Sequence, residues 1–296
     1  MKLGFEQVSC IAILNRTKNI LYGTSKRMKL GECRVGLIGF GAMLQAIYRA
    51  WDLAKLIPSS HVLFAQRDAH KAQENQKKFG ITSATLATLV EKSQILILGV
   101  RPAEVDLVLK SLSSLDLQGK MLLTVVAGLK FKRYQKYLGK DLPLIRAMPN
   151  IAASVGSAMT VLSMGPQATL DFQSLARVLF SSMGQVTEVA EPLMDIACAV
   201  AGSGPGFVFR LIESMARAGE KEGLPYLDAL KMAAQTFYGA AHMVLQGKNP
   251  SELIHEIATP GGTTEAGFRV MQEMAIEKSF QKVIEASLLR SQEMGR

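Results

Sequence analysis

The sequence predicts an α/β domain with a doubly wound, mainly parallel sheet, followed by a domain built from helices alone. Short apolar stretches alternate with helical patterns between residues 33 and 190. A glycine-rich turn joins the first apolar stretch to the first helical one. After about residue 190 the strand signals stop, and only helical segments separated by Gly and Pro follow.

The α/β region is expected to span residues 33–190. The segment QILILGV is apolar throughout, which is typical of a strand buried on both faces of a parallel sheet. Gly80 is placed to end a polar helix that Asp68 begins as its N-cap. The predicted strands are 33–40, 61–66, 94–100, 121–128, 142–150, 157–163 and 185–190, and the predicted helices are 42–56, 68–80 and 167–184.

The all-helical region is expected to span residues 191–296. Its predicted helices are 191–200, 205–222, 226–247, 251–257, 264–275 and 277–294. The segment 226–247 is rich in Ala, Met and Leu and offers little polar surface. Helices that are apolar on several faces are buried against something, so we expect a subunit interface here and a dimer or larger assembly.

The composition is ordinary for a globular protein and excludes several classes. The 296 residues are 48% hydrophobic and 20% charged, and no apolar run reaches the length of a membrane span. Three scattered Cys and four His show neither disulfide nor metal-ligand spacing. We therefore expect no metal, no membrane partner and a reducing, cytoplasmic compartment.

The net charge of +9 is concentrated at one end of the chain. Residues 1–34 carry seven Lys and Arg against two Glu, so little excess remains elsewhere and no nucleic-acid partner is expected. Residues 1–32 show no clear period. They could be a weak targeting segment. The preferred interpretation is a disordered extension upstream of the fold. A chain beginning at Met28 is then expected to fold normally.

The turn after the first strand has the composition of a phosphate-binding loop. In GLIGFGAM, Gly39 and Gly41 allow a tight turn and a close approach of the backbone to a pyrophosphate, which the following helix N-terminus stabilises. Leu44 replaces the third glycine of the full fingerprint. This pattern favours a Rossmann-type dinucleotide-binding domain, with a tight turn that binds nothing as the alternative. The candidate cofactor-binding residues of the loop are Gly36, Gly39, Phe40, Gly41, Ala42 and Met43.

The end of the second strand selects between the two nicotinamide dinucleotides. NAD-binding proteins usually place an acid there for the ribose 2′-hydroxyl, whereas this chain has Gln66 and Arg67. A cation without an acid suits the 2′-phosphate of NADP. We therefore expect NADPH as the cofactor, with NADH as a possible substitute. The alternative interpretation is that the arginine is simply solvated and binds no cofactor.

A second glycine motif, ATPGGTTEAGF at 258–268, lies in the helical region. Pro260, Gly261 and Gly262 stop any helix or strand, and Thr263 and Thr264 then stand where a helix begins. Unpaired N–H groups and two hydroxyls at that point could bind an anion. A simple helix N-cap is the alternative.

From about Arg34 to the C-terminus the chain resembles the pyrroline-5-carboxylate reductases, which reduce a cyclic imine to proline. Four stretches carry the resemblance: VGLIGFGAM (35–43), RAMPN (146–150), GSGPGFVF (202–209) and ATPGGTTEA (258–266). The resemblance implies use of NADPH or NADH, the substrate 1-pyrroline-5-carboxylate, and an intertwined homodimer that often forms a decamer. In that family the active site lies where the nucleotide domain meets the helical domains of the dimer.

The resemblance also implies roles for individual residues. Thr264 is expected to be catalytic, donating a hydrogen bond towards the imine nitrogen, while backbone N–H groups of Gly261, Gly262, Thr263 and Thr264 hold the substrate carboxylate. The resemblance also implies that the ribose and nicotinamide are lined by residues at or just after the ends of three predicted strands: Val100, Arg101, Pro102, Ala127, Gly128, Met148, Pro149 and Asn150.

The chain departs from the family pattern at several places. Arg101 stands where Lys is usual, Ile151 and Ala152 replace Thr-Pro, and Phe207 replaces a tyrosine. The loop 246–250 is one residue short and lacks an acid. These changes affect the expected substrate affinity and rate more than the cofactor site.

Two other functions are considered. A β-hydroxyacid dehydrogenase needs a catalytic lysine on the first long helix of the second domain, and residues 203–220 contain none. A catalytically impaired NADP-binding relative with a regulatory role would tolerate the departures, but Thr264 and both glycines argue for an enzyme.

Overall fold

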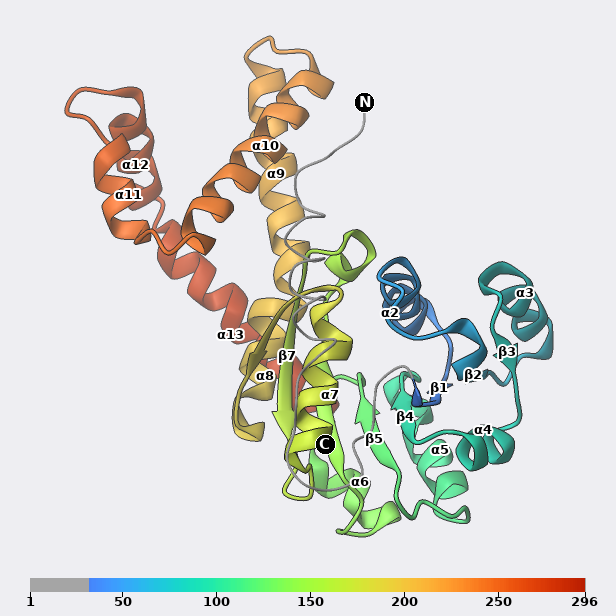
Figure 1. Ribbon diagram of the computed structural model, residues 1–296. Helices are drawn as coiled ribbons and strands as arrows, with labels where there is room; N and C mark the ends of the chain where they lie inside the picture. Colours follow the sequence, from blue (N-terminus) through green and yellow to red (C-terminus); the bar gives the residue numbers. More distant parts are fainter. Residues whose placement is uncertain (1–31, 296) are drawn as a thin grey trace. The chain divides into compact units, whose positions relative to one another are not determined.

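The computed structural model describes residues 32–295, so the proposed extension and the Met28 start lie outside the described residues, apart from Glu32. Contacts divide the chain into two units (Figure 1). The first runs to Gly202 and takes in the end of the chain from Leu288, and the second is Ser203–Ser287. The predicted domain limits at 33–190 and 191–296 stay predictions.

The first unit contains a single eight-stranded sheet with the order β3-β2-β1-β4-β5-β6-β7-β8. The pairs are parallel except for β6 and β7, which run antiparallel. The strands are β1 (Val35–Ile38), β2 (Val62–Ala65), β3 (Thr82–Ser83), β4 (Ile95–Leu98), β5 (Met121–Thr124), β6 (Leu144–Met148), β7 (Ala158–Met164) and β8 (Gly184–Glu188). The order reverses direction between β1 and β4, which is where doubly wound sheets bind ligands.

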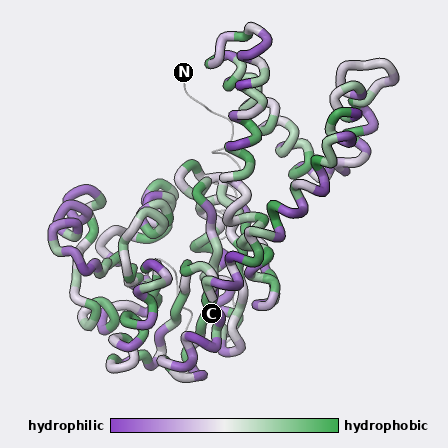
Figure 2. Tube along the Cα trace, turned by 180° about the vertical axis from the view of Figure 1, so that it is seen from behind, coloured by the Kyte–Doolittle hydropathy of each residue, from purple (hydrophilic) through white to green (hydrophobic). Residues whose placement is uncertain are grey.

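Helices cover both faces of this sheet (Figure 1). They are α2 (Ala42–Leu53), α3 (Ala69–Phe79), α4 (Leu86–Lys92), α5 (Val105–Leu112), α6 (Phe131–Leu138), α7 (Leu170–Ser181) and the short α8 (Met194–Ala197). Along β4, Ile95 and Ile97 pack with α2, α3 and α7, whereas Leu96 and Leu98 pack with α4, α5 and α6. The apolar residues predicted for this strand are thus buried on both faces, and Figure 2 shows the hydropathy along the trace.

The second unit is helical throughout its described length. Its helices are α9 (Gly204–Lys221), α10 (Tyr226–Leu245), α11 (Pro250–Ile257), α12 (Thr263–Glu273) and most of α13 (Ile276–Met294). The predicted helix at 191–200 proved to be three short pieces: a 3₁₀ turn (Glu191–Leu193), α8, and a π-helical turn (Cys198–Gly202). The wide turn runs directly into the Gly and Pro residues that open α9.

Candidate active site

The glycine loop lies between β1 and α2, beside the end of β4. Gly39 has a φ of +84°, and a Cβ there would lie 2.4 Å from the side chain of Val100. Its N–H donates to the Ala65 carbonyl of β2 at 2.9 Å. A Cβ on Gly41 would meet nothing closer than the Gly39 carbonyl at 4.0 Å, so open space lies above this residue. Gly39 shapes the turn, and Gly41 leaves room for a ligand to approach the backbone.

The first turn of α2 can receive an anion. The N-cap is Gly41, and no side chain caps the helix. The N–H groups of Ala42 and Met43 therefore stand at an uncapped helix N-terminus, with the positive end of the helix dipole behind them. These geometric features fit the pyrophosphate of a dinucleotide.

Two other residues of the loop motif are buried within the fold. Phe40 is completely buried against Tyr48, Phe64 and Phe79, which anchors the loop to the core. Gly36 lies inside β1, where a Cβ would come within 2.3 Å of Leu89 on α4. Close packing against α4 thus explains why this position is a glycine. The assignment of Gly36 to the cofactor site stays a prediction.

Two arginines meet at one carboxylate beside the ends of β2 and β4. Arg101 donates from both Nε and Nη2 to Glu104, at 3.3 and 2.9 Å, and Arg67 Nη2 lies 3.1 Å from Glu104 Oε1. The hydrogen bonds from Arg101 lower the pKa of the Glu104 carboxyl. The arginine side chains are 76% and 77% exposed, whereas Glu104 is 26% exposed. The group therefore presents a net positive charge to solvent.

The acid at the start of the second predicted helix acts as expected. Asp68 caps α3 by accepting from the Lys71 N–H at 3.1 Å, and Gly80 ends the helix in the left-handed region. Gln66, directly after β2, is half-buried and its side chain is hydrogen-bonded to Asn75 of α3. Asp68 is thus a helix cap, and no acid replaces Gln66 at the strand end.

The residues predicted to line the ribose and nicotinamide lie at or just after the ends of β4, β5 and β6. Pro102 begins a 3₁₀ turn after Val100 and Arg101. Ala127 and Gly128 follow β5, and Gly128 has a φ of +80° and packs against the last turn of α13.

Met148, the last residue of β6, and Asn150, which follows the strand, are buried. The Asn150 side chain accepts from the Ala152 N–H at 3.1 Å and donates to the Ala201 carbonyl at 3.0 Å, so both its oxygen and its nitrogen help to fix the chain. Pro149 lies buried between them, while Ile151, one of the departures from the family pattern, is exposed.

The PGGTT segment lies in the second unit and begins α12. Gly261 has a φ of +74°, and a Cβ on Gly262 would lie 2.6 Å from the Thr259 hydroxyl, so both positions need glycine. Gly262 is the N-cap, and no side chain caps the helix. Thr263 and Thr264 therefore stand at the first two helical positions and do not cap it.

Some backbone N–H groups of this segment already donate to an acceptor, and others do not. Gly261 N–H donates to Glu265 Oε2 at 2.8 Å, and Gly262 N–H donates to the Thr259 carbonyl at 2.9 Å. The N–H groups of Thr263 and Thr264, in the first helical turn, have no backbone acceptor within the helix. An anion at this point could therefore accept hydrogen bonds from the backbone N–H groups of the two threonines. The neighbouring Glu265 is an acid that the sequence analysis did not single out.

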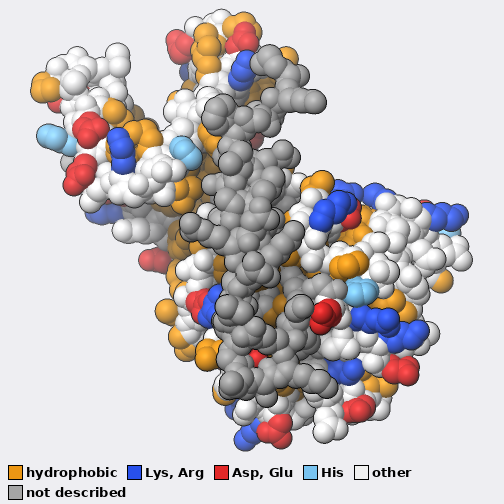
Figure 3. All heavy atoms as spheres, viewed as in Figure 1, with side chains coloured by type: hydrophobic (Ala, Val, Ile, Leu, Met, Phe, Trp, Pro, Cys, Tyr) orange, Lys and Arg blue, Asp and Glu red, His pale blue; other side chains and the backbone are white. Residues whose placement is uncertain are grey.

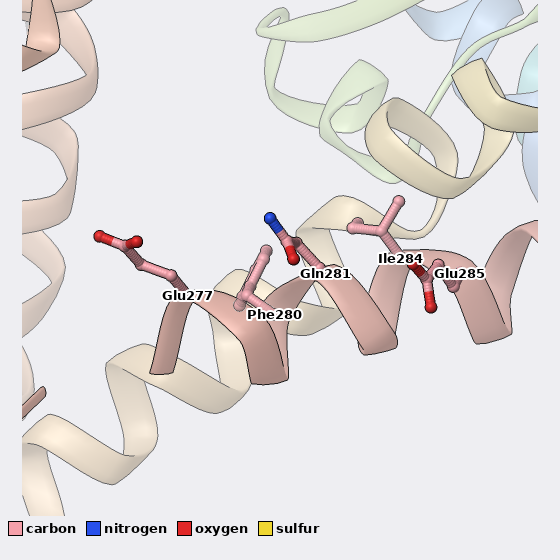
Figure 4. Close-up of a pocket in the computed structure, with 5 residues that line it drawn as sticks. All are labelled: Glu277, Phe280, Gln281, Ile284 and Glu285. Carbon is pink, nitrogen blue, oxygen red and sulfur yellow. The ribbon is translucent and has the colours of Figure 1, made fainter. Parts of the chain in front are cut away.

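A shallow depression of about 360 Å³ lies along α13 (Figure 4). Its lining comes from one helix: Glu277, Phe280, Gln281, Ile284 and Glu285. None of the predicted site residues lines it, and two of its five side chains are acidic, so it has no feature that would bind an acidic substrate or a dinucleotide. Across residues 32–295, no group of three or more His, Cys, Asp and Glu could hold a metal ion.

Two family models match separate parts of the chain. Residues 191–294 match the pyrroline-5-carboxylate reductase dimerisation family, and residues 34–128 match a family described as NADP oxidoreductase, coenzyme F420-dependent. The first match contains the PGGTT segment, and the second contains the glycine loop, Arg67 and Arg101.

Known proteins resemble the chain over most of its length. A pyrroline-5-carboxylate reductase of Methanosarcina acetivorans is 34% identical over 265 residues, covering 89% of this chain and 98% of the relative. The Arabidopsis thaliana enzyme of the same name is 32% identical, covering 89% and 96%.

Solved structures share the fold. Pyrroline carboxylate reductase of Plasmodium falciparum, with NADP bound, has a TM-score of 0.82 at 24% identity and covers 90% of this chain and all of the other. The Streptococcus pyogenes enzyme has a TM-score of 0.81 at 26% identity, covering 88% and 98%. Because identity above 30% extends over nearly the whole of both chains, this protein belongs to the pyrroline-5-carboxylate reductase family.

Proposed function

We propose that the protein reduces 1-pyrroline-5-carboxylate to L-proline at the expense of NADPH. The observation that carries this function is full-length membership of the reductase family, with both glycine motifs retained. The uncapped helix N-terminus after Gly41 suits a dinucleotide, and the uncapped N-terminus of α12 suits a carboxylate. Each of the two motifs thus has a helix N-terminus that can receive an anion.

NADPH is the cofactor that the charges at the end of β2 favour. The positive charges of Arg67 and Arg101 outweigh the negative charge of Glu104. No acid stands at the end of β2, where a ribose 2′-hydroxyl would need an acceptor. The Plasmodium falciparum relative was solved with NADP bound. The pyrophosphate would lie at the N–H groups of the α2 N-terminus and the 2′-phosphate near the arginines; NADH remains a possible substitute.

The substrate carboxylate is assigned to the N–H groups of Thr263 and Thr264. Both glycine N–H groups already have acceptors, so the glycines act by giving the backbone its shape. The Thr264 hydroxyl then donates a hydrogen bond to the imine nitrogen. When bound, NADPH would supply a hydride to the carbon of the C=N bond, and the nitrogen would take one proton from solvent. Alignment of the two reactants provides most of the acceleration.

The helical unit is proposed to form a homodimer. Large apolar side chains are exposed along α9 and α10, and Figure 3 shows hydrophobic side chains at the surface of this unit. By length and composition alone, the helical stretch Glu191–Lys221 could cross a membrane. A second copy of the chain is the occupant that the dimerisation family favours over lipid or nucleic acid. A decamer and a cytoplasmic location remain further predictions.

A steady-state assay tests the proposed function. Purified protein should oxidise NADPH only when 1-pyrroline-5-carboxylate is present, and L-proline should accumulate in equal amount. A catalytically impaired relative would bind NADPH with no turnover above that of buffer. The same assay with NADH gives the cofactor preference, and kcat/KM for NADPH should be the larger value.

A further inference from the structure

The Gln66 side chain is the last member of a chain of hydrogen-bonded amides. The Phe40 carbonyl at the other end of this chain fixes which atom of each amide donates and which accepts. Gln45 of α2 donates from Nε2 to the Phe40 carbonyl at 3.1 Å and to Asn75 Oδ1 at 3.3 Å. Asn75 of α3 then donates from Nδ2 to Gln66 Oε1 at 2.8 Å. Asn75 is 9% exposed, which is unusual for its residue type, and it bridges the two helices.

The backbone sets the orientation of every amide in this chain. A carbonyl oxygen can only accept, so Gln45 has to direct its NH₂ group towards Phe40. The same nitrogen donates to Asn75, which must therefore face Gln45 with its oxygen and Gln66 with its nitrogen. Gln66 is left with its own oxygen occupied and both N–H donors of Nε2 uncommitted among the described residues.

We propose that Asn75 and Gln45 are positioning residues that make Gln66 a hydrogen-bond donor, and that they thereby favour the 2′-phosphate of NADPH over the 2′-hydroxyl of NADH. This inference rests on the proposed use of a nicotinamide dinucleotide at the glycine loop. A phosphate accepts only, so it pairs with the Gln66 N–H groups alongside Arg67. An acceptor at the same position would suit a ribose hydroxyl, as an acid does in NAD-binding proteins.

Asn75→Asp reverses the polarity without removing the bridge. An aspartate can accept from Gln45 as before but cannot donate, so the Gln66 amide has to turn and present its oxygen. Isothermal titration with NADP⁺ and NAD⁺ should show the ratio of their affinities falling about tenfold, the worth of one charge-assisted hydrogen bond. Asn75→Ala, which frees the amide to rotate, should lower the ratio less.

Two controls separate positioning from the added negative charge. Gln73→Glu puts a carboxylate on an exposed position of the same helix, outside the amide chain, and should leave the ratio nearly unchanged. Gln66→Met removes the amide, and Asn75→Asp added to it should then have no further effect. Melting of each apo-protein reports whether the fold is intact.

The outcomes distinguish this inference from the proposed function. Asn75→Asp could lower the ratio of NADP⁺ to NAD⁺ affinity equally in the unaltered protein and in the Gln66→Met variant. The aspartate charge would then act directly on the cofactor, and the positioning role would be wrong. An unchanged ratio in both Asn75 variants overturns it as well. If the unaltered protein binds neither dinucleotide, the cofactor assignment fails and this inference falls with it.

Discussion

The two units of the chain differ in how much core each provides for itself. The nucleotide-binding unit buries Trp51, Tyr134 and Phe180 almost completely, in clusters on both faces of its sheet. The hydrophobic cluster of buried residues in the helical unit consists of three alanines, Ala216, Ala229 and Ala233. The first unit thus has an extensive core of its own, whereas the small core of the second, with only Ile212, Tyr226 and Leu230 packed against it, leads us to expect that a partner covers this unit.

The exposed side chains of the helical unit show where that covering would go. Leu227 is 77% exposed, Met232 is 56% exposed and Leu245 is 75% exposed, all on α10. Burying such a set stabilises by about 25 cal/mol per Å² of apolar surface removed from water. The difference between the units therefore predicts that the helical unit depends on assembly more than the nucleotide-binding unit does.

The largest expected effect comes from placing a charge on α10. Met232→Glu would bury an unpaired carboxylate at the proposed interface, so the dimer should dissociate and turnover should fall at least about 100-fold. NADP⁺ binding should persist, because the nucleotide-binding unit has its own core. Sedimentation and titration measure the two properties separately.

Leu107→Glu is the matched control for this substitution. Leu107 is 61% exposed on α5, in the nucleotide-binding unit, and we expect only a small change in mass or turnover. If both variants stay assembled and active, the exposed apolar surface of α10 is not an interface.

Thr264→Ala is expected to have the next largest effect. It removes the proposed donor to the imine nitrogen, and losing one such oriented donor typically costs about 1–3 kcal/mol, or roughly one to two decades in kcat/KM. NADP⁺ affinity should not change. Thr263→Ala, one position earlier on the same helix turn, should do far less; equal losses would show that the hydroxyl of Thr264 has no special role.

Arg67→Ala should have a smaller effect, confined to one cofactor. The KM for NADPH should rise about tenfold through loss of a charge-assisted contact, while the KM for NADH stays nearly constant. Lys71→Ala removes a different exposed cation, in the first turn of α3, and serves as the control. Equal changes for both cofactors would contradict the assignment of Arg67 to the 2′-phosphate.

The smallest effect is expected at Cys33, in the core of the nucleotide-binding unit. Burial raises the pKa of its thiol to about 11, so at pH 8 the reactive thiolate is scarce, and it becomes abundant only as the pH approaches that pKa. Peptide-resolved alkylation should be slow in the unaltered protein and equally slow in Met232→Glu. Fast labelling in the variant would mean that the nucleotide-binding unit also depends on the partner.

The sequence predicted those parts of the fold that local patterns encode. The strand run QILILGV, the cap at Asp68, the stop at Gly80 and the start of α12 at Thr263 all appear as expected. The short elements β3, α4, α5 and α6 were not predicted. Each has two to eight residues, and in so short a segment a hydrophobic period is not distinguishable from an irregular apolar run.

The site was predictable in its motifs but not in its contacts between elements. The glycine loop and the arginine after β2 could be read directly, because each depends on neighbours in sequence. Glu104 could have been noticed as an acid three residues after Arg101, but its ion pair with Arg67 depends on the pairing of strands. The Gln45–Asn75–Gln66 amides join two helices and a strand end, and no local pattern signals such a bridge.

Active-enzyme sedimentation tests the central claim most directly, because it records the mass of the species that turns over. The protein is sedimented through NADPH and 1-pyrroline-5-carboxylate while absorbance at the nicotinamide band is followed. We predict that NADPH is consumed at a boundary moving as a dimer or larger assembly of the 32.1 kDa chain. Consumption at the boundary of a monomer, or no consumption at any boundary, would contradict the account.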